Sequence, residues 1–500
     1  MNIFCHKSHL KRHQGWIIIT INDPITNIFM IKDAQVENKI SIKKLIAFAF
    51  ILFAVYIMLF PMANQPVAFS YSAAVILITL TCWSASLFPP FLTGLIFFAL
   101  TITLQLIEPN LLFAGFGSTA VWLIIAGFII GSAISSSGLD KRLAAIIAPH
   151  LTISYPRLIA GLVVSAILLG FIMPSSIGRA VVLIPIGMAL AEKVGFARGS
   201  NGRRGIATAL AIACNMPSFA VLPANIPNMI LAGSSENLFN VHFGYMEYLL
   251  LHFPVLGLVK SLALIWLVLK LFPATINASE NSAQSEQQNT EFDHKLQLKV
   301  LIILSITLLF WVTDSLHGIN AAWVGLVAAI LLLMPKFGVL EPKKFNSSID
   351  FGTVIFVSAA LGLGTLVNVS GVGETMGEAF IHLLPESVEN TFLSFMSLSL
   401  ISTVTGLVTT TPGVPTVLTP MAADFAQATG FSVPAVLMTQ VIGFSTVIFP
   451  YQVAPLIIAM QLAKESLASL LKITLPLALI TLIILMPLDY LWWHLLGWIN

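Results

Sequence analysis

Long apolar stretches, separated by short polar segments, fill the chain from residue 45 almost to its carboxyl end. A run of about 17 to 25 apolar residues is long enough to cross the hydrocarbon core of a bilayer as a helix. Apolar runs of this length or shorter occupy residues 45–62, 69–87, 91–107, 119–136, 158–173, 179–191, 205–219, 227–233, 243–272, 298–313, 321–334, 351–369, 392–408, 414–428, 434–460 and 473–491. The pattern predicts an all-α polytopic membrane protein.

The composition agrees, because 57% of the residues are hydrophobic and only 9% are charged, whereas about a quarter of the residues in a soluble domain are charged. The three cysteines are scattered and give neither a disulfide framework nor metal-ligand spacing. The chain has no HExxH motif, no paired membrane aspartates and no nucleophile–base arrangement. We therefore expect neither an enzyme nor a bound metal or organic cofactor, and the absence of a basic surface domain predicts no nucleic-acid partner.

Two matched polar breaks interrupt the apolar pattern. Residues 174–187 read PSSIGRAVVLIPIG and residues 409–422 read TTTPGVPTVLTPMA, and they align Gly178 with Gly413. Within a membrane, an unwound backbone is tolerated only where protein or a water-filled cavity satisfies its N–H and C=O groups. Matched breaks in the two halves of a chain are typical of transporters and indicate one shared binding site.

The positions of lysine and arginine predict the topology. If each break lies in a re-entrant hairpin and the amino terminus is cytoplasmic, the basic clusters near residues 141, 203, 270, 343 and 464 all face the cytoplasm. Five crossings and one hairpin per repeat then insert the second half upside down, which gives about eleven transmembrane helices with two re-entrant hairpins in an inverted-topology repeat. The expected location is the cell inner (cytoplasmic) membrane, with the carboxyl terminus outside.

The same pattern divides the chain into four parts. They are a cytoplasmic amino-terminal tail (1–43), a first half (44–272) with its hairpin near 158–191, a polar cytoplasmic linker (273–296), and an inverted second half (297–500) with its hairpin near 392–428. The tail is basic and His-rich, but it lacks the acidic or cysteine partners of a metal site. Translation from Met30 would leave only a short charged tail.

Hydroxyl groups and glycines at the breaks, followed by proline-broken helices, form the candidate site. Hydroxyls, amides and helix amino termini suit an anion, and the candidate substrate-binding residues are Ser175, Ser176, Gly178, Arg179, Thr409, Thr410, Thr411, Gly413, Asn225 and Asn228. Hydroxyls and carbonyls equally suit Na+, for which the candidate residues are Ser175, Asn225, Thr410 and Gln452. The sequence therefore leaves open whether Na+ is the coupling ion.

Arg179 is the most informative single residue in these breaks. A guanidinium at the centre of a span costs roughly 2.5 to 3.5 kcal/mol on insertion scales, so we expect another group to compensate its charge. Four roles are open to this side chain. It can bind a carboxylate or sulfate through two hydrogen bonds or take the place of a coupling cation. It can also form an ion pair with an acid such as Glu192 or Asp424, or extend towards the cytoplasm. Lys260, with His252 nearby, is a weaker candidate because its long stem can extend to the interface.

From residue 45 to 498 the chain resembles the divalent anion:sodium symporter (DASS) family of the ion-transporter superfamily. The resemblance rests on LTCWSASLFPPFLTGLI, FGSTAVWLIIAGFIIGSAISSSGLDKRLA, LLFWVTDSLHGINAAWVGL, IPNMILAG and the two breaks. It implies a homodimer of scaffold and transport domains with elevator-type alternating access. It also implies a substrate site formed by the hairpin tips and the unwound parts of the following helices.

Both tips depart from the family pattern that the resemblance supplies. Family members commonly carry Ser-Asn-Thr there, next to substrate carboxylates and sodium, whereas this chain reads Ser175-Ser176-Ile177 and Thr410-Thr411-Pro412. Both amides are missing and Arg179 adds a charge. We expect a secondary active transporter of small divalent or trivalent anions, either di- or tricarboxylates or sulfate-like anions. The alternative is a cation/proton antiporter of the same superfamily, although the breaks contain no carboxylate.

Overall fold

A computed structural model of the chain describes residues 9–13, 16–20, 29–32, 42–139, 142, 151–173, 175–276, 294–385 and 390–499. Contacts divide the chain into two units, Met1–Phe48 and Ala49–Asn500. The first unit contains an antiparallel sheet in the order β1 (His9–His13), β2 (Trp16–Thr20), β3 (Phe29–Lys32). Sequence analysis gave this tail no secondary structure. Most of the predicted linker, residues 277–293, lies outside the described residues.

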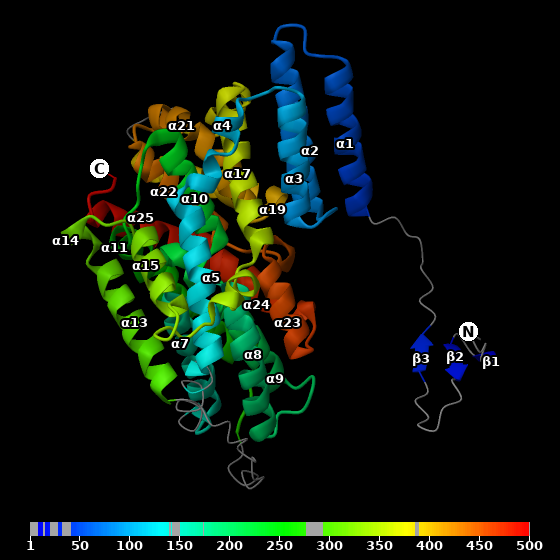
Figure 1. Cartoon of the computed structure of the whole chain (residues 1–500), viewed down its shortest axis with the longest axis vertical. Helices are drawn as coiled ribbons and strands as arrows, with labels where there is room; N and C mark the ends of the chain where they lie inside the picture. The colour runs from blue at the N-terminus through cyan, green and yellow to red at the C-terminus, as the bar shows by residue number, and fades with distance from the viewer. Residues whose placement is uncertain are drawn as a thin grey trace. The chain divides into compact units, whose positions relative to one another are not determined.

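Helices make up the described part of the second unit (Figure 1). Those before the linker, with α1 reaching back into the first unit, are α1 (Ile42–Leu59), α2 (Val67–Ala85), α3 (Pro90–Thr103), α4 (Pro109–Leu112), η1 (Ala114–Gly117), α5 (Thr119–Ser137), α7 (Tyr155–Ile172), α8 (Ser176–Lys193), α9 (Asn201–Ala213), η2 (Pro217–Ala220), η3 (Leu222–Ala224), α10 (Ile226–Phe239), α11 (Tyr245–His252), η4 (Phe253–Val259) and α12 (Lys260–Leu271).

The second half contains α13 (His294–Val312), α14 (Asp314–His317), α15 (Ala321–Leu333), η6 (Pro342–Lys344), α16 (Phe345–Ser348), α17 (Phe351–Val369), α18 (Val372–Ile381), α19 (Thr391–Thr409), α20 (Gly413–Leu418), η7 (Thr419–Met421), α21 (Ala422–Thr429), α22 (Val433–Phe444), η8 (Pro450–Gln452), α23 (Ala454–Ala463), α24 (Leu467–Ile480), η9 (Thr481–Leu485) and α25 (Met486–Leu495). One segment in each half is π-helical, η4 in the first and η9 in the second.

The prediction of an all-α polytopic membrane protein is confirmed. Among the described residues, seven helices are long and apolar enough to cross a membrane, or up to eight if a bent helix pair counts as one span. Five further apolar helices are shorter, at 10–17 residues. The number of about eleven crossings stays a prediction, because length and composition alone do not decide which of the shorter helices span.

The two halves repeat one order of elements. In the first half, α5 is followed by the hairpin α7–α8, by α9, by an unwound segment, by α10, and by a long helix with a π-helical interruption. The second half presents α17, the short helix α18, the hairpin α19–α20 with its continuation α21, then α22, an unwound segment, α23 and again a π-interrupted helix. Figure 1 shows α8 and α9 towards one end of this unit and α21 and α22 towards the other. The repeat is therefore inverted, as predicted.

Serine hydroxyls cap the amino-terminal ends of the helices around the first break. Ser154 and Ser175 accept hydrogen bonds from the backbone N–H groups of the first turns of α7 and α8, and Ser200 does the same for α9. Each bond satisfies an otherwise unpaired amide at a helix start. One large apolar core then joins both hairpins to α9, α22 and α23. Helix α8 packs on α23 and α10 packs on α20, so each half supports the other half's site.

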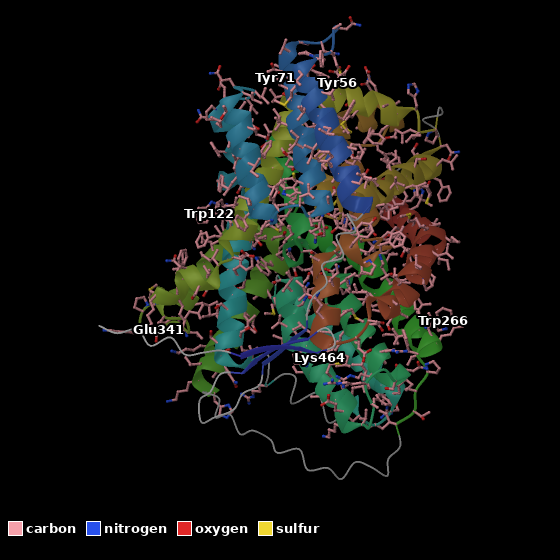
Figure 2. All side chains as sticks on the ribbon, turned by 90° about the vertical axis from the view of Figure 1, so that its right-hand side faces the viewer. Tyr56, Tyr71, Trp122, Trp266, Glu341 and Lys464 are labelled. Atoms are coloured by element: carbon pink, nitrogen blue, oxygen red, sulfur yellow. The ribbon has the colours of Figure 1, made fainter. Side chains whose placement is uncertain are left out.

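Apolar side chains also cover much of the exterior. Trp266 on α12 is 53% exposed and Trp122 on α5 is 37% exposed, and Figure 2 shows both on the outer surface. A soluble monomer rarely exposes large contiguous apolar patches, whereas a helix that faces lipid does so because lipid is its solvent. The exposed apolar surface thus agrees with a membrane environment.

Candidate functional site

The first hairpin turns between α7 and α8. Ser175 Oγ accepts a hydrogen bond from the Gly178 amide at 3.1 Å and so caps α8. A Cβ at Gly178 would lie 3.0 Å from Met173 Cε and 3.3 Å from Ser175 Cβ and Oγ. The absence of a side chain at Gly178 therefore permits the tight turn. The remaining residue of the tip, Pro174, lies outside the described residues.

Opposite this tip, the chain unwinds between α9 and α10. Asn225 Nδ2 donates to the Asn215 carbonyl at 3.4 Å and to Ser218 Oγ at 3.2 Å. Asn228 Nδ2 donates to the carbonyls of Ser218 at 3.2 Å and Val221 at 2.9 Å. The two asparagines predicted to bind ligand therefore hold the unwound backbone. Asn228 Oδ1 and both polar side-chain atoms of Asn215 are buried without a hydrogen-bond partner in the described part of the chain.

Arg179 joins the first tip to this unwound segment. Its guanidinium donates to the Cys214 carbonyl through Nε at 3.0 Å, and through the terminal nitrogens to the Met173 carbonyl, to Ser176 Oγ at 3.0 Å and to the Ala224 carbonyl at 3.3 Å. The residue is 0% exposed. Every one of these acceptors is electrically neutral, so the positive charge is solvated by the protein without being neutralised.

The geometry bears directly on the alternatives that the sequence left open for Arg179. Glu192 lies 2.9 Å from Arg203, and within the described residues no carboxylate accepts a hydrogen bond from Arg179. Complete burial is incompatible with a side chain that reaches the cytoplasmic interface. The other two interpretations, an anion ligand or the place of a coupling cation, stay predictions.

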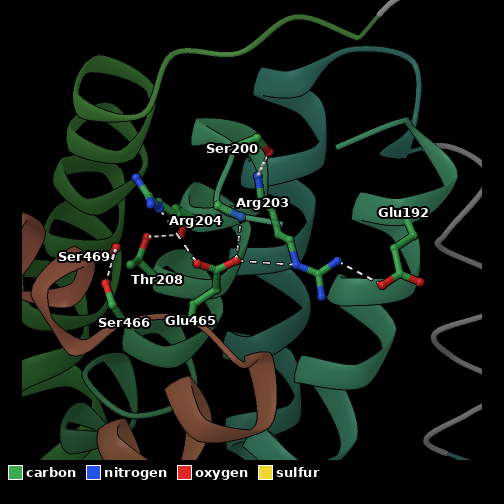
Figure 3. A network of polar contacts seen from close by, with 9 residues as sticks. Glu192, Ser200, Arg203, Arg204, Thr208, Glu465, Ser466 and Ser469 are labelled. Carbon is green, nitrogen blue, oxygen red and sulfur yellow. Dashed lines mark hydrogen bonds and ion pairs between the residues drawn. The ribbon is translucent and has the colours of Figure 1, made fainter. Parts of the chain in front are cut away.

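Glu192 belongs to an ion-pair network at the ends of α8, α9 and α23. Arg203 contacts Glu192 and also Glu465, at 3.5 Å, while Arg204 lies 3.8 Å from Glu465. Figure 3 shows Glu465 placed between the two arginines. Glu465 follows α23 of the second half, whereas its partners lie on α9 of the first. The network therefore ties the second half to the first hairpin.

The second hairpin turns at Thr410. This residue has φ 76° and ψ 165°, a conformation that is essentially restricted to glycine. Gly413 opens α20, and a Cβ there would lie 2.6 Å from Thr409 Cβ. Thr409 Oγ1 donates back to the Thr405 carbonyl at 2.8 Å. Backbone strain at such a position is typical of functional sites, because surrounding contacts must hold it.

Gln452 holds the second tip to its own unwound segment. The Gln452 carbonyl accepts hydrogen bonds from the Thr411 amide at 3.2 Å and from Thr411 Oγ1 at 3.3 Å. Its side-chain Oε1 accepts from the amides of Ile448 at 2.9 Å and Phe449 at 2.8 Å. The candidate residues thus form two clusters, each joining a hairpin tip to the broken helix that follows it.

Lys260 and Asp489 are among the charged residues that lie buried outside the breaks. Lys260, 2% exposed, donates to the Ser445 carbonyl at 2.8 Å at the carboxyl end of α22. Asp489 on α25 is 0% exposed, and neither carboxylate oxygen has a hydrogen-bond partner among the described residues. Sequence analysis gave Lys260 little weight and missed Asp489. The signal was an acid inside the last apolar helix, which is a default indication of function.

A family model described as the sodium:sulfate symporter transmembrane region matches residues 39–499. The chain belongs to this family. The resemblance to the divalent anion:sodium symporters is thereby confirmed, and the protein is a multi-pass membrane transporter of that family. The match includes both hairpins, both unwound segments and the two π-interrupted helices.

Individual relatives of this symporter-family chain are distant. A "Membrane protein" of Cupriavidus necator is 25% identical and covers 83% of this chain and 84% of its own length. The sodium-dependent dicarboxylate transporter SdcS of Staphylococcus saprophyticus is 20% identical, with 75% and 80% covered. An L-tartrate/succinate antiporter of Escherichia coli is 23% identical, with 55% and 58% covered. The solved Alcanivorax borkumensis YdaH transporter matches with a TM-score of 0.49 at 17% identity, covering 78% and 88%.

Proposed function

We propose that this protein is a secondary active transporter of small divalent or trivalent anions, either di- or tricarboxylates or sulfate-like anions. Its relatives' names support this class, since one is a sodium-dependent dicarboxylate transporter and another an L-tartrate/succinate antiporter. In this proposal the protein is a homodimer in the inner membrane, with its amino terminus in the cytoplasm and its carboxyl terminus outside.

The observation that carries the proposal is the pair of tip-and-break clusters. In the first, the amino-terminal end of α8 and the hydroxyls of Ser175 and Ser176 are suited to an anion. In the second, the hydroxyls of Thr409, Thr410 and Thr411 lie beside a strained turn. With Gly178, Gly413, Asn225, Asn228 and Arg179, these residues form the proposed substrate site.

Buried polar atoms without a hydrogen-bond partner among the described residues are available to bind a ligand at this site. Native proteins leave few buried polar atoms without a partner, and each exception calls for a ligand, a water or a functional role. Asn215, which follows Arg179's partner Cys214 in the chain, presents an amide donor and an acceptor, and Asn228 presents an acceptor; none of these three buried atoms has a hydrogen-bond partner among the described residues. A carboxylate, its hydroxyl group or a bridging water would satisfy these atoms.

Elevator-type movement is the proposed transport mechanism. Both hairpins, α9, α22 and α23 share one continuous apolar core, whereas α5, α13 and α15 pack in a separate core. Closely packed interiors move as units. The body that carries both tips can therefore move as one against the other helices and expose the site to each side in turn.

A cation/proton antiporter is the second candidate function. The buried carboxyl group of Asp489, which has no hydrogen-bond partner in the described part of the chain, favours it, because intramembrane acids often form proton relays. The two functions make opposite predictions for reconstituted vesicles. An antiporter would move protons when Na+ or K+ is added without any organic or sulfate anion, whereas an anion transporter would not.

Uptake of labelled succinate, citrate and sulfate into proteoliposomes tests the proposed function. We expect saturable uptake of at least one anion and a rise in the melting temperature of the purified protein when that anion binds. Ser175→Ala should lower its affinity by about tenfold, which corresponds to ~1.4 kcal/mol. Ser347→Ala, which removes an exposed hydroxyl that donates to the Lys344 carbonyl, is the matched control. Unchanged affinity in Ser175→Ala, or no anion binding by the wild type, would refute the proposal.

A further inference from the structure

We propose that Asp489 binds a proton that is taken up together with the anion and crosses the membrane with it. This inference rests on the proposed anion transport and deepens it by naming a coupled ion. Three features of the molecule support it: the surroundings of the Asp489 carboxyl group, its place in the repeat, and the core to which its helix belongs.

Asp489 lies on α25 in the interior of the protein. It is 0% exposed, and neither carboxyl oxygen has a hydrogen-bond partner among the described residues. An ionised carboxylate in such surroundings loses its hydration without replacement, whereas a carboxyl group that has taken up a proton is neutral. The ammonium of Lys260 attracts the carboxylate without donating a hydrogen bond to it, and a nearby opposite charge favours the ionised form. Both protonation states are therefore available to Asp489.

Other buried polar atoms around Asp489 also lack a hydrogen-bond partner in the described part of the chain. Trp493 lies one turn further along α25, and its Nε1 has no acceptor. The Trp493 ring contacts the His252 ring at 5.7 Å between centroids, and His252 Nδ1 has no partner. It also contacts Phe395 at 5.2 Å, next to Ser394, whose Oγ is likewise without a partner. Such exceptions call for a ligand, a water or a functional role.

Few titratable groups surround this carboxyl group. Helix α25 packs on α11, α19 and η9, and α19 and η9 contain no titratable side chain. The titratable residues of α11 and of α25 itself are Tyr245, Glu247, Tyr248, His252, Tyr490 and His494. Most of them have partners elsewhere: Glu247 accepts from the Gly244 amide and Tyr248 donates to the Phe219 carbonyl, while Tyr490 and His494 contact Thr391 and the Ile499 carbonyl. Lys260 on α12 is the charge that acts on Asp489.

The surroundings of Asp489 suit a proton better than a metal cation. Secondary transporters coordinate Na+ with carbonyls of unwound backbone, whereas α25 is helical at Asp489 and its backbone is hydrogen-bonded within the helix. The side chains around the carboxyl group are mostly aromatic and supply few oxygens. The ammonium of Lys260 would also repel a second cation. A proton needs only one oxygen and neutralises the carboxylate.

The repeat places Asp489 beside a matched pair of irregular helices. Lys260 directly follows the π-helical segment η4, and Asp489 lies about one turn beyond the π-helical segment η9. The two segments hold equivalent places in the inverted halves and pack against each other. Isolated π-helical interruptions are frequent at functional sites. The acid and the base therefore meet where the two halves carry this irregularity.

A proton on Asp489 would travel with the anion. Trp493 of the same helix belongs to the apolar core that joins both hairpins, which is the body proposed to move. Lys260 donates to the Ser445 carbonyl at 2.8 Å, and the unwound segment after Ser445 holds Thr411 of the second tip. Protonation of Asp489 removes the negative charge beside Lys260 and so makes this region more favourable for an anion. By the reciprocity of linked equilibria, anion binding then favours proton uptake.

Asp489→Asn separates the proton from the anion. An amide has nearly the shape of a protonated carboxyl group and does not ionise, so the variant should bind anions without taking up a proton. Asp350→Asn is the matched control. It makes the same chemical change at an exposed residue that caps α17, and asparagine caps a helix as well as aspartate does.

The experiment measures anion affinity and proton uptake of the purified proteins with succinate, citrate and sulfate. We expect a pH-indicator dye in weakly buffered solution to report about one proton taken up per anion bound by the wild type. Its affinity should fall by up to about tenfold per pH unit as the pH rises from ~6 to ~8. Asp350→Asn should behave alike, which also accounts for protonation of the anion itself. Asp489→Asn should lose the proton uptake and the dependence on pH that exceeds the anion's own.

Proteoliposomes extend the test to transport. An acidic exterior should accelerate anion uptake by the wild type and by Asp350→Asn, and it should leave uptake by Asp489→Asn unchanged. Anion binding by the wild type without proton uptake would overturn the inference, even if Asp489→Asn cannot be purified. Proton uptake that persists in Asp489→Asn would overturn it as well, because the proton would then bind elsewhere. If none of the three anions binds to the wild type, the proposed function fails and the inference falls with it.

Discussion

Replacing Gln452 by leucine should loosen the second hairpin tip. The side chain is 2% exposed, and its Oε1 accepts hydrogen bonds from the amides of Ile448 and Phe449 at 2.9 and 2.8 Å. These bonds fix the unwound segment so that the Gln452 carbonyl can receive Thr411. Leucine fills a similar volume but accepts no hydrogen bond, so both amides lose their partner.

The magnitude follows from those two amides. A buried amide without a partner costs about 1–3 kcal/mol. Two such amides would together cost about 2–6 kcal/mol. Phe449 is 38% exposed, which lets water compensate its amide, so we expect a total of about 2 kcal/mol, at the lower end of that range. The free energy of unfolding should fall by that amount and the melting temperature by several degrees. Anion affinity should fall too, because Thr410 and Thr411 lose their fixed position.

Thermal melting of the purified protein, with and without a saturating anion, measures both effects. Gln461→Leu on α23 is the matched control, since it makes the same chemical change at an exposed position. It should change the melting temperature very little. If Gln452→Leu melts and binds like the wild type, or if Gln461→Leu is damaged to the same extent, the proposed role of Gln452 is wrong.

Two further substitutions test the packing and the charges around the site, each by melting of the purified protein. Gly443→Ala would place a Cβ 2.1 Å from Ser402 Oγ and should lower the free energy of unfolding by about 1–3 kcal/mol. Its control, Gly117→Ala, should be tolerated because a Cβ there has nothing within 4 Å. Equal melting temperatures of the two variants would contradict the close packing of α19 on α22. Glu465→Gln removes the charge of the buried acid between the two arginines (Figure 3) and should cost about 3 kcal/mol, the lower end of the range for a buried pair, because Arg204 is 39% exposed. The exposed Glu341→Gln should change little. A harmless Glu465→Gln would show that the network does not stabilise the fold.

The hairpins were predictable because their chemistry is visible in residue types. Ser175 and Gly178 in one break, and Gly413 with its prolines in the other, are poor helix interiors inside apolar runs. The repeat and the charge pattern then fixed the inverted order. Helix ends were less predictable, as α10 continues to Phe239, beyond the apolar run 227–233 that was expected.

The partners of Arg179 were not predictable. They are backbone carbonyls of Met173, Cys214 and Ala224, and a carbonyl leaves no mark in the residue type that carries it. Glu192, the acid nearest in sequence among those considered, instead pairs with Arg203 through the packing of α8 on α9. Asp489 was visible in the sequence but lies outside both breaks, and only the three-dimensional arrangement shows that its buried carboxyl group has no hydrogen-bond partner among the described residues.

The most direct test of the account is uptake of labelled succinate, citrate and sulfate by proteoliposomes that contain the wild-type protein, compared with protein-free liposomes. Because the family relatives include a dicarboxylate transporter and a tartrate/succinate antiporter, we predict saturable uptake of at least one of these anions. Uptake of every anion no faster than into protein-free liposomes, with proton movement on addition of Na+ or K+ alone, would contradict the account.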